Sequence, residues 1–153
     1  MLIGKPIEAI YHSSIVVYGV EYFFGGGICQ MPPKKTPYGI PIKEIDYGTT
    51  EIPKEIFEDY LKEITDKFSF KTYNMINNNC NHFTNDICIF LTGNEIPDDV
   101  LNQHKSLAGT PMGNMILPFL EKMNIPQMME GNNNNFNNNN NMYNPYNPYN
   151  QYR

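Results

Sequence analysis

The sequence predicts an α+β domain over residues 1–125, with a small antiparallel sheet packed against helices, and a low-complexity tail over residues 126–153. Strand-like segments separated by turn signals lie near the start, and amphipathic helical patterns follow them. Beyond Pro126 the composition changes abruptly to asparagine, tyrosine and proline. A domain of this length can bury a modest core of its own.

The first predicted element is a β-hairpin. Residues 11–18 are rich in β-branched and aromatic side chains, Gly19 marks a turn, and residues 20–24 return as a second strand before consecutive glycines. A loop rich in glycine and proline, which contains Cys29, follows. We expect one more short strand, over residues 40–47.

A helix is predicted over residues 53–68. Its apolar positions recur at helical spacing, and charged residues occupy the other face. Pro53 suits the first turn of a helix because its backbone angle is already helical. The stripe predicted to face the core comprises Ile56, Phe57, Tyr60, Leu61, Ile64 and Phe68.

A second helix is predicted to begin at Cys80. Apolar or small side chains recur at three and four residues from there to Leu91, Asn79 can cap the start, and Gly93 can close the end. We expect further helices over residues 98–107 and 110–123. Asparagine-rich tracts with spaced aromatics cannot form a core, so the tail is expected to be disordered and prone to self-association.

Charge and composition exclude several function classes. A net charge of −5 disfavours nucleic acid and anionic membranes as partners. The start lacks a signal-peptide pattern, and no apolar run approaches the roughly 18 residues of a membrane span. Three cysteines cannot all pair within one chain, which suits a reducing compartment. We therefore expect a soluble cytoplasmic protein, with the nucleus as a second location.

Metal chemistry is not expected. Cys80 and His82 form the one close pair of ligand-type residues, and no second Cys or His pair at ligand spacing completes a tetrahedral site. The sequence likewise implies no cofactor.

Cys80 is the candidate nucleophile. At a helix start, the positive end of the helix dipole favours a thiolate, which is the reactive form of cysteine. The alternative is a small buried core residue, an interpretation that fits the mid-helix Cys88 well. His82 is a poor base because two helical residues turn the chain by about 200°. His104 lies in a polar, surface-like stretch, whereas His12 lies on a predicted strand that would fix its side chain.

Two segments together resemble the PPPDE family of permuted-papain-fold cysteine peptidases. They are residues 12–25, HSSIVVYGVEYFFG, and residues 79–85, NCNHFTN; the resemblance continues through residues 90–97 and 110–113 and covers roughly residues 1–124. Within the family, the chain is most similar to the deSUMOylating isopeptidases (DeSI). In that family the histidine precedes the cysteine, and position by position the dyad falls on His12 and Cys80.

The resemblance implies a thiol isopeptidase acting on SUMO-conjugated proteins, with ubiquitin conjugates as the second substrate class and a homodimer as one assembly state. His12 would take the proton of Cys80, and the Cys80 N–H would hold the oxyanion with a second, unassigned donor. No third catalytic residue is evident. Asn79 and Asn81 flank the nucleophile and could contribute, but in a chain so rich in asparagine the default interpretation is that they are turn and cap residues. A palmitoyl-protein thioesterase with the same dyad and a non-catalytic binding module remain alternatives.

One departure from the family pattern concerns the sheet. Family members carry an additional strand well upstream of the histidine, and here eleven residues precede His12. We expect that this opening strand is missing, through truncation, a misplaced start or loss. If it was lost, another element should cover the exposed edge, because an uncovered strand invites pairing with another chain.

Overall fold

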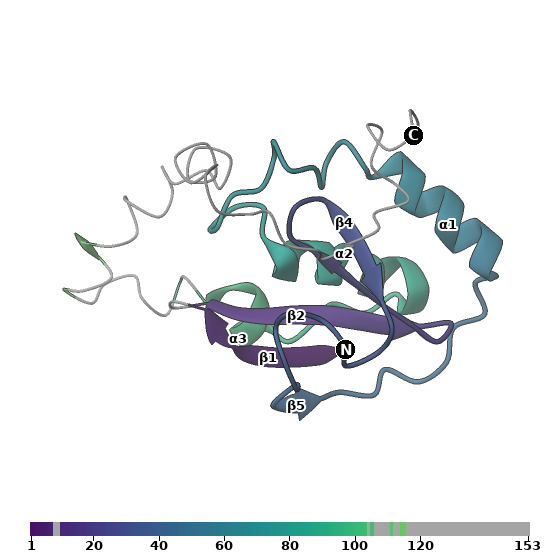
Figure 1. Ribbon diagram of the computed structural model, residues 1–153, viewed down its shortest axis with the longest axis horizontal. Coiled ribbons are helices and arrows are strands. Elements are labelled where there is room, and N and C mark those ends of the chain that lie inside the picture. Colours follow the sequence, from purple (N-terminus) through teal and green to yellow (C-terminus); the bar gives the residue numbers. More distant parts are fainter. Residues whose placement is uncertain (8–9, 104, 106–110, 112–113, 116–153) are drawn as a thin grey trace.

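The computed structural model describes residues 1–7, 10–103, 105, 111 and 114–115, and the account below concerns these residues. The described strands form an antiparallel sheet in the order β4-β3-β2-β1-β5 (Figure 1). The strands are β1 (Leu2–Ile7), β2 (Ile10–Val17), β3 (Val20–Phe24), β4 (Ile28–Met31) and β5 (Lys43–Glu44), and the helices are α1 (Lys54–Glu63), α2 (Cys80–Thr92) and α3 (Asp98–Leu101). The predicted α+β class is confirmed.

The predicted hairpin is formed by β2 and β3. Two residues connect the strands, and both have positive φ, 52° at Tyr18 and 74° at Gly19. This is the turn whose twist matches that of the flanking strands. The ladder between β2 and β3 runs only from Val17↔Val20 to Ile15↔Tyr22. The N-terminal half of β2, which carries His12, therefore extends past the end of β3.

The edge of β2 opposite β3 is covered by β1, a strand that was not predicted from the sequence. Strand β1 pairs with β2 from Leu2↔Ser14 to Ile7↔Ile10, with a register shift between Ile3 and Pro6. Strand β5 pairs with β1 in turn. Among the described residues, a strand upstream of His12 is therefore present and pairs along the edge of β2 opposite β3.

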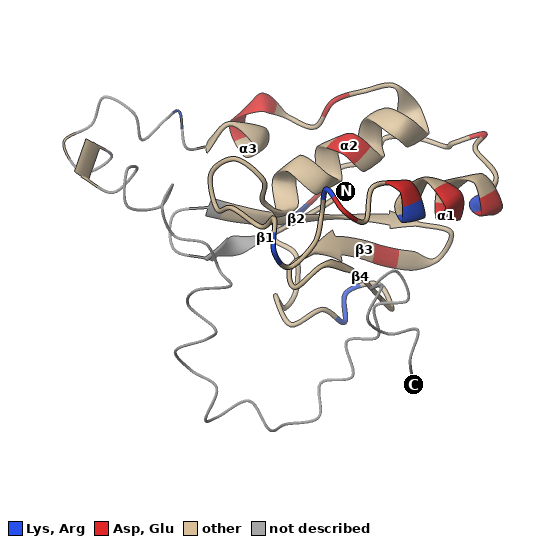
Figure 2. Cartoon of the chain, turned by 90° about the horizontal axis from the view of Figure 1, so that it is seen from above, with Lys and Arg blue, Asp and Glu red and all other residues tan. Residues whose placement is uncertain are grey.

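The core lies between the sheet and the helices. Helices α1 and α2 lie on the same side of the strands (Figure 2), and α2 packs on β2 and β3. Tyr22 and Phe24 of β3 point toward them and meet aromatic rings from three other segments. Phe57 lies 5.1 Å from Tyr22, and Phe68 and Phe83 lie 5.2 Å and 6.3 Å from Phe24, measured between ring centroids.

Three predicted boundaries were wrong. Cys29 lies on strand β4 and not in a loop, because the segment after the glycines turns back and pairs with β3, Phe23 opposite Cys29. The strand expected over residues 40–47 is reduced to Lys43–Glu44. Helix α1 stops at Glu63 and gives way to turns, and Ile56, expected in the core, is 51% exposed.

The C-terminal predictions are only partly testable. The helix expected over residues 98–107 is described as α3, over Asp98–Leu101. The helix expected over residues 110–123 and the tail from residue 126 lie outside the described residues, except for isolated positions. Within the described part of the chain, no helix is long and apolar enough to cross a membrane.

Candidate functional site

Cys80 is the first residue of helix α2, as predicted, and the preceding residue builds the helix start. The Asn79 side chain accepts hydrogen bonds from the Asn81 and His82 N–H groups, and the His82 ring accepts one from the Asn79 N–H at 3.1 Å. Together these bonds form a capping box. His82 therefore serves the helix cap, and Gly93, with φ 76°, closes the other end of α2.

The Cys80 sulfur lies in a buried environment lined by backbone N–H groups. Burial raises the pKa of the Cys80 thiol to about 11, and hydrogen bonding from the N–H groups of Ser13, Asn81 and Cys80 itself acts in the opposite direction. The first turn of α2 carries no acidic residue, and the acidic residue of this helix is Asp86, coloured red in Figure 2. No carboxylate therefore opposes a thiolate in that turn.

Cys80 lies against the part of β2 that is not paired with β3. Beyond Ile15, the β3-facing edge of β2 has no ladder, and groups from other elements occupy it. The Tyr11 N–H donates to the Gln103 Oε1 at 2.6 Å, the Asn81 Nδ2 donates to the Tyr11 carbonyl at 2.8 Å, and the Ser13 N–H faces the Cys80 sulfur. The start of α2 thus takes a place that a neighbouring strand would otherwise fill.

His12 lies between these bonded positions, and its side chain is 5% exposed. The imidazole stacks on the Tyr38 ring with centroids 3.5 Å apart and meets Phe23 edge-on at 5.9 Å. Its Nε2 is buried without a hydrogen-bond partner. Burial lowers the pKa of His12 to about 3, so the ring is neutral near pH 7.

Tyr38 covers the candidate site from the loop after β4. A Cβ added at Gly25 would lie 3.3 Å from the Tyr38 hydroxyl, so this part of the glycine turn passes close to the ring. Burial raises the pKa of the Tyr38 phenol to about 12, and negative charge on the nearby Cys80 and Cys29 sulfurs would act in the same direction. Tyr38 therefore borders both members of the predicted dyad.

A buried carboxylate holds this loop in place. Glu21 is 3% exposed and accepts hydrogen bonds from the Ser14 hydroxyl at 2.6 Å and the Lys34 N–H at 2.8 Å. Ser14 lies two residues after His12 on β2, so the two side chains point to the same face of the sheet. The bond to Lys34 thus draws the loop over the face that carries His12.

The structure brings His12 and Cys80 to one corner of the fold without a hydrogen bond between their side chains. Ser13, the neighbour of His12, meets both the Cys80 sulfur through its N–H and the Asn81 side chain through its hydroxyl. Cys29 and Cys88 are also buried free thiols, on β4 and in the middle of α2. His104 lies outside the described residues.

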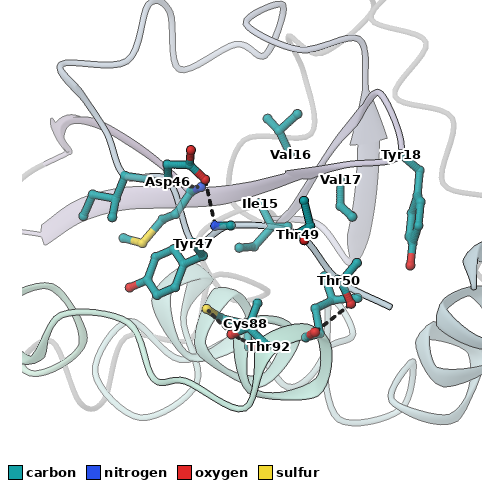
Figure 3. Close-up of a pocket in the computed structure, with 14 residues that line it drawn as sticks. Ile15, Val16, Val17, Tyr18, Asp46, Tyr47, Thr49, Thr50, Cys88 and Thr92 are labelled. Carbon is teal, nitrogen blue, oxygen red and sulfur yellow. Dashed lines mark hydrogen bonds between the residues drawn. The ribbon is translucent and has the colours of Figure 1, made fainter. Parts of the chain in front are cut away.

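One described hollow lies elsewhere. It has a volume of about 380 Å³ and is lined by residues of β2, of the segment 45–50 and of the C-terminal half of α2. Figure 3 shows Cys88, Thr92, Tyr47 and Thr50 around it. Neither this hollow nor a second one of about 200 Å³ near Tyr11 is lined by Cys80 or His12.

Sequence reasoning missed the residues that complete the site. Tyr38 and Gln103 gave no signal in the sequence, since neither belongs to a local motif with Cys80 or His12. Asn81 was interpreted as a turn or cap residue, and that interpretation was wrong: Asn79 caps the helix, whereas the Asn81 side chain bonds to β2. Among the described residues, no cluster of three or more His, Cys, Asp or Glu side chains could hold a metal ion.

Comparison with known proteins yields one family and a consistent set of relatives. The family description "PPPDE putative peptidase domain" matches residues 1–121. The human protein named desumoylating isopeptidase 1 is 39% identical over 127 residues, which span 82% of this chain and 76% of the relative. Its Rattus norvegicus counterpart has the same identity and coverage, and that of Xenopus laevis is 35% identical over 82% of this chain and 75% of its own length.

Proposed function

The chain belongs to the PPPDE peptidase family and is a hydrolase of the cysteine-peptidase type, and we propose that it is an isopeptidase that removes SUMO from lysine side chains of target proteins. Cys80 is the proposed nucleophile and His12 the proposed base. The observation that carries the assignment is the pair of hydrogen bonds from Asn81, the residue after Cys80, to Tyr11 and Ser13 on either side of His12.

The chemistry follows from the groups in this corner. The unpartnered Nε2 of His12 takes the proton of the Cys80 thiol, and the thiolate attacks the isopeptide carbonyl carbon. The tetrahedral intermediate collapses, the C–N bond breaks, and the lysine amine leaves with the proton held by His12. Water, deprotonated by His12, then hydrolyses the thioester and frees the modifier and the Cys80 thiol.

The second oxyanion donor is proposed to be the Ser13 N–H. Of the three N–H groups that face the Cys80 sulfur, that of Asn81 already donates to the Asn79 side chain at 2.9 Å. The N–H groups of Cys80 and Ser13 remain for a developing negative charge. Two such donors held in a buried site stabilise an oxyanion because they need no reorganisation during the reaction.

The described form of the site is closed and uncharged. With the pKa of Cys80 raised to about 11 and that of His12 lowered to about 3, both groups are neutral at pH 7. Proton transfer is therefore expected only when a substrate carbonyl reaches the sulfur. Tyr38, which stacks on His12, must yield part of its place to the substrate.

SUMO is the proposed modifier because the similar relatives are named desumoylating isopeptidases. Ubiquitin is the second modifier to test. A palmitoyl thioesterase would need an apolar groove beside the nucleophile, and the described hollow of about 380 Å³ lies beside Cys88 instead.

The experiment is a panel of electrophilic probes on the full chain: SUMO and ubiquitin with C-terminal warheads, and an acyl-thioester probe. The proposal predicts labelling by the SUMO probe that is abolished by Cys80→Ala and strongly slowed by His12→Ala. Labelling by the ubiquitin or acyl probe alone would contradict the choice of substrate. A folded protein that no probe labels would support the non-catalytic alternative.

A further inference from the structure

We propose that Asn81 is a positioning residue for the reaction, which ties the nucleophile's helix to the strand segment that carries the base. The inference rests on the proposed function, because it assigns Asn81 the task of fixing Cys80 relative to His12. Asn81 acts through Tyr11 and Ser13, the two residues that flank His12.

Both polar ends of the Asn81 side chain are used. Its Nδ2 donates to the Tyr11 carbonyl at 2.8 Å, and its Oδ1 accepts from the Ser13 hydroxyl at 2.6 Å. A carbonyl can only accept, so the amide nitrogen must face Tyr11, and this fixes the amide orientation. At 1% exposure Asn81 cannot reach a bulky substrate at the surface, which leaves these two bonds as its contribution.

The strand needs such support at this place. The ladder to β3 has ended at Ile15, and the ladder to β1 shifts register between Ile3 and Pro6, opposite residues 11–13. Unpaired strand ends are the regions of a sheet that open most easily. Gln103 supports the same segment through the Tyr11 N–H, but it comes from beyond α3 and not from the helix that carries Cys80.

Asn81 is covalently next to Cys80 within α2, so its amide moves with the nucleophile. Hydrogen bonds from this amide to the residues on both sides of His12 hold the first turn of α2 against β2. They thereby set the distance between the Cys80 thiol and the His12 imidazole. A misplacement of about 1 Å between reacting groups can cost about 10²-fold in rate. Loss of the Asn81 amide should therefore lower kcat, while KM stays nearly constant because no substrate contact is removed.

Asn85 provides a matched control on the same helix. It lies one turn further along α2, is 9% exposed, and accepts a hydrogen bond from the Ile96 N–H at 3.0 Å. Asn85→Ala thus removes a buried amide that bonds to backbone, as Asn81→Ala does, but away from β2. The two variants should lose similar stability and differ in catalysis.

The test measures kcat and KM for SUMO cleavage by the full-length wild type, Asn81→Ala, Asn81→Asp and Asn85→Ala. It also follows the pH dependence of Cys80 alkylation by iodoacetamide, read by peptide mass spectrometry. We expect Asn81→Ala to lower kcat about 10²-fold with KM within about twofold. Asn81→Asp places a carboxylate on the residue next to Cys80 and should move the alkylation profile upward by about one pH unit. Asn85→Ala should leave kcat, KM and the profile unchanged.

Equal losses of kcat in Asn81→Ala and Asn85→Ala, with wild-type alkylation profiles in all variants, would overturn the inference. Failure of the proposed function would look different. In that case the wild type itself would cleave no SUMO conjugate, and the alkylation profiles alone would decide whether Asn81 sets the environment of Cys80.

Discussion

Helix α2 holds two buried cysteines in different surroundings, one at its first residue and one in its C-terminal half, which we call the Cys80 end and the Cys88 end. At the first residue, Cys80 faces backbone N–H groups, and its neighbour Asn81 is bonded across to β2. Two turns on, the Cys88 sulfur lies 3.7 Å from the Thr92 hydroxyl beside the hollow of about 380 Å³ (Figure 3). Burial raises the pKa of both thiols.

The difference shows that the hollow and the groups suited to catalysis lie at different places along this helix. The Cys88 end offers room, but no histidine and no terminal N–H groups of the helix. The Cys80 end is filled by Tyr38 and by β2, yet it combines a helix start, a neutral imidazole and backbone donors. Reactive sites are recognised by such groups and not by volume alone.

The largest expected effect comes from replacing each of the two cysteines with alanine. Cys80→Ala should lower SUMO cleavage by about 10⁴-fold or more, because removal of a nucleophile leaves only the surrounding site. Cys88→Ala should stay within about twofold of the wild type. Gel-based cleavage of a SUMO conjugate measures both. A comparable loss in both variants would place the chemistry outside the Cys80 end.

The acid sensitivity of the fold should depend on His12. A folded pKa of about 3 lies below the unfolded value of 6.5, so the unfolded state binds an extra proton between these pH values. This contribution to stability is present above pH 6.5 and is lost as the pH falls toward 3. From pH 7 to pH 5 the wild type should lose about 2 kcal/mol more than His12→Gln, measured by urea unfolding. Equal losses would contradict a buried neutral imidazole.

Removing the tyrosine ring near each cysteine should raise the alkylation rate of that cysteine only. Tyr38→Ala removes the ring over His12 and lets the pKa of Cys80 fall, so alkylation of Cys80 at pH 7 should rise about tenfold, after allowing for the weaker nucleophilicity of a more acidic thiol. Tyr47, which lines the hollow, is the counterpart: Tyr47→Ala should raise alkylation at Cys88 only. Peptide mass spectrometry distinguishes the two, and a rise at the other cysteine would refute the contrast.

The smallest effect is expected at the far end of α2. The Thr92 hydroxyl donates to the Cys88 carbonyl at 2.8 Å and accepts from the Asn94 N–H at 3.2 Å. Thr92→Val should cost about 1 kcal/mol of unfolding free energy and leave the rate of Cys80 alkylation unchanged. A changed alkylation rate would mean that the two ends of the helix are coupled.

Elements with strong local signals could be predicted from the sequence. Helix α2 is marked by its cap residue Asn79, its apolar spacing and Gly93, and the hairpin by β-branched residues around a turn. Strand β4 was missed because its pairing with β3 follows a glycine turn that reads as a loop. Strand β1 carries a glycine and a proline and forms only through pairing on both sides.

The residues of the site also fall into those that could be predicted from local sequence patterns and those that could not. Cys80 and His12 were identified from a helix start and a strand, with the family resemblance supplying their pairing. Tyr38 reaches His12 through a loop held by Glu21, and Asn81 reaches Tyr11 across 70 residues of sequence. Such contacts depend on the tertiary fold, and no spacing rule in a single sequence encodes them.

The central claim is that Cys80, at the first residue of α2, is the nucleophile and that His12 is its base. The most direct test is to react the full chain with SUMO bearing a C-terminal electrophile and to map the adduct by peptide mass spectrometry, with and without His12→Ala. The account predicts one adduct, on Cys80, that forms at least about tenfold more slowly without His12. An adduct on Cys88 or Cys29, or a rate that does not depend on His12, would contradict it.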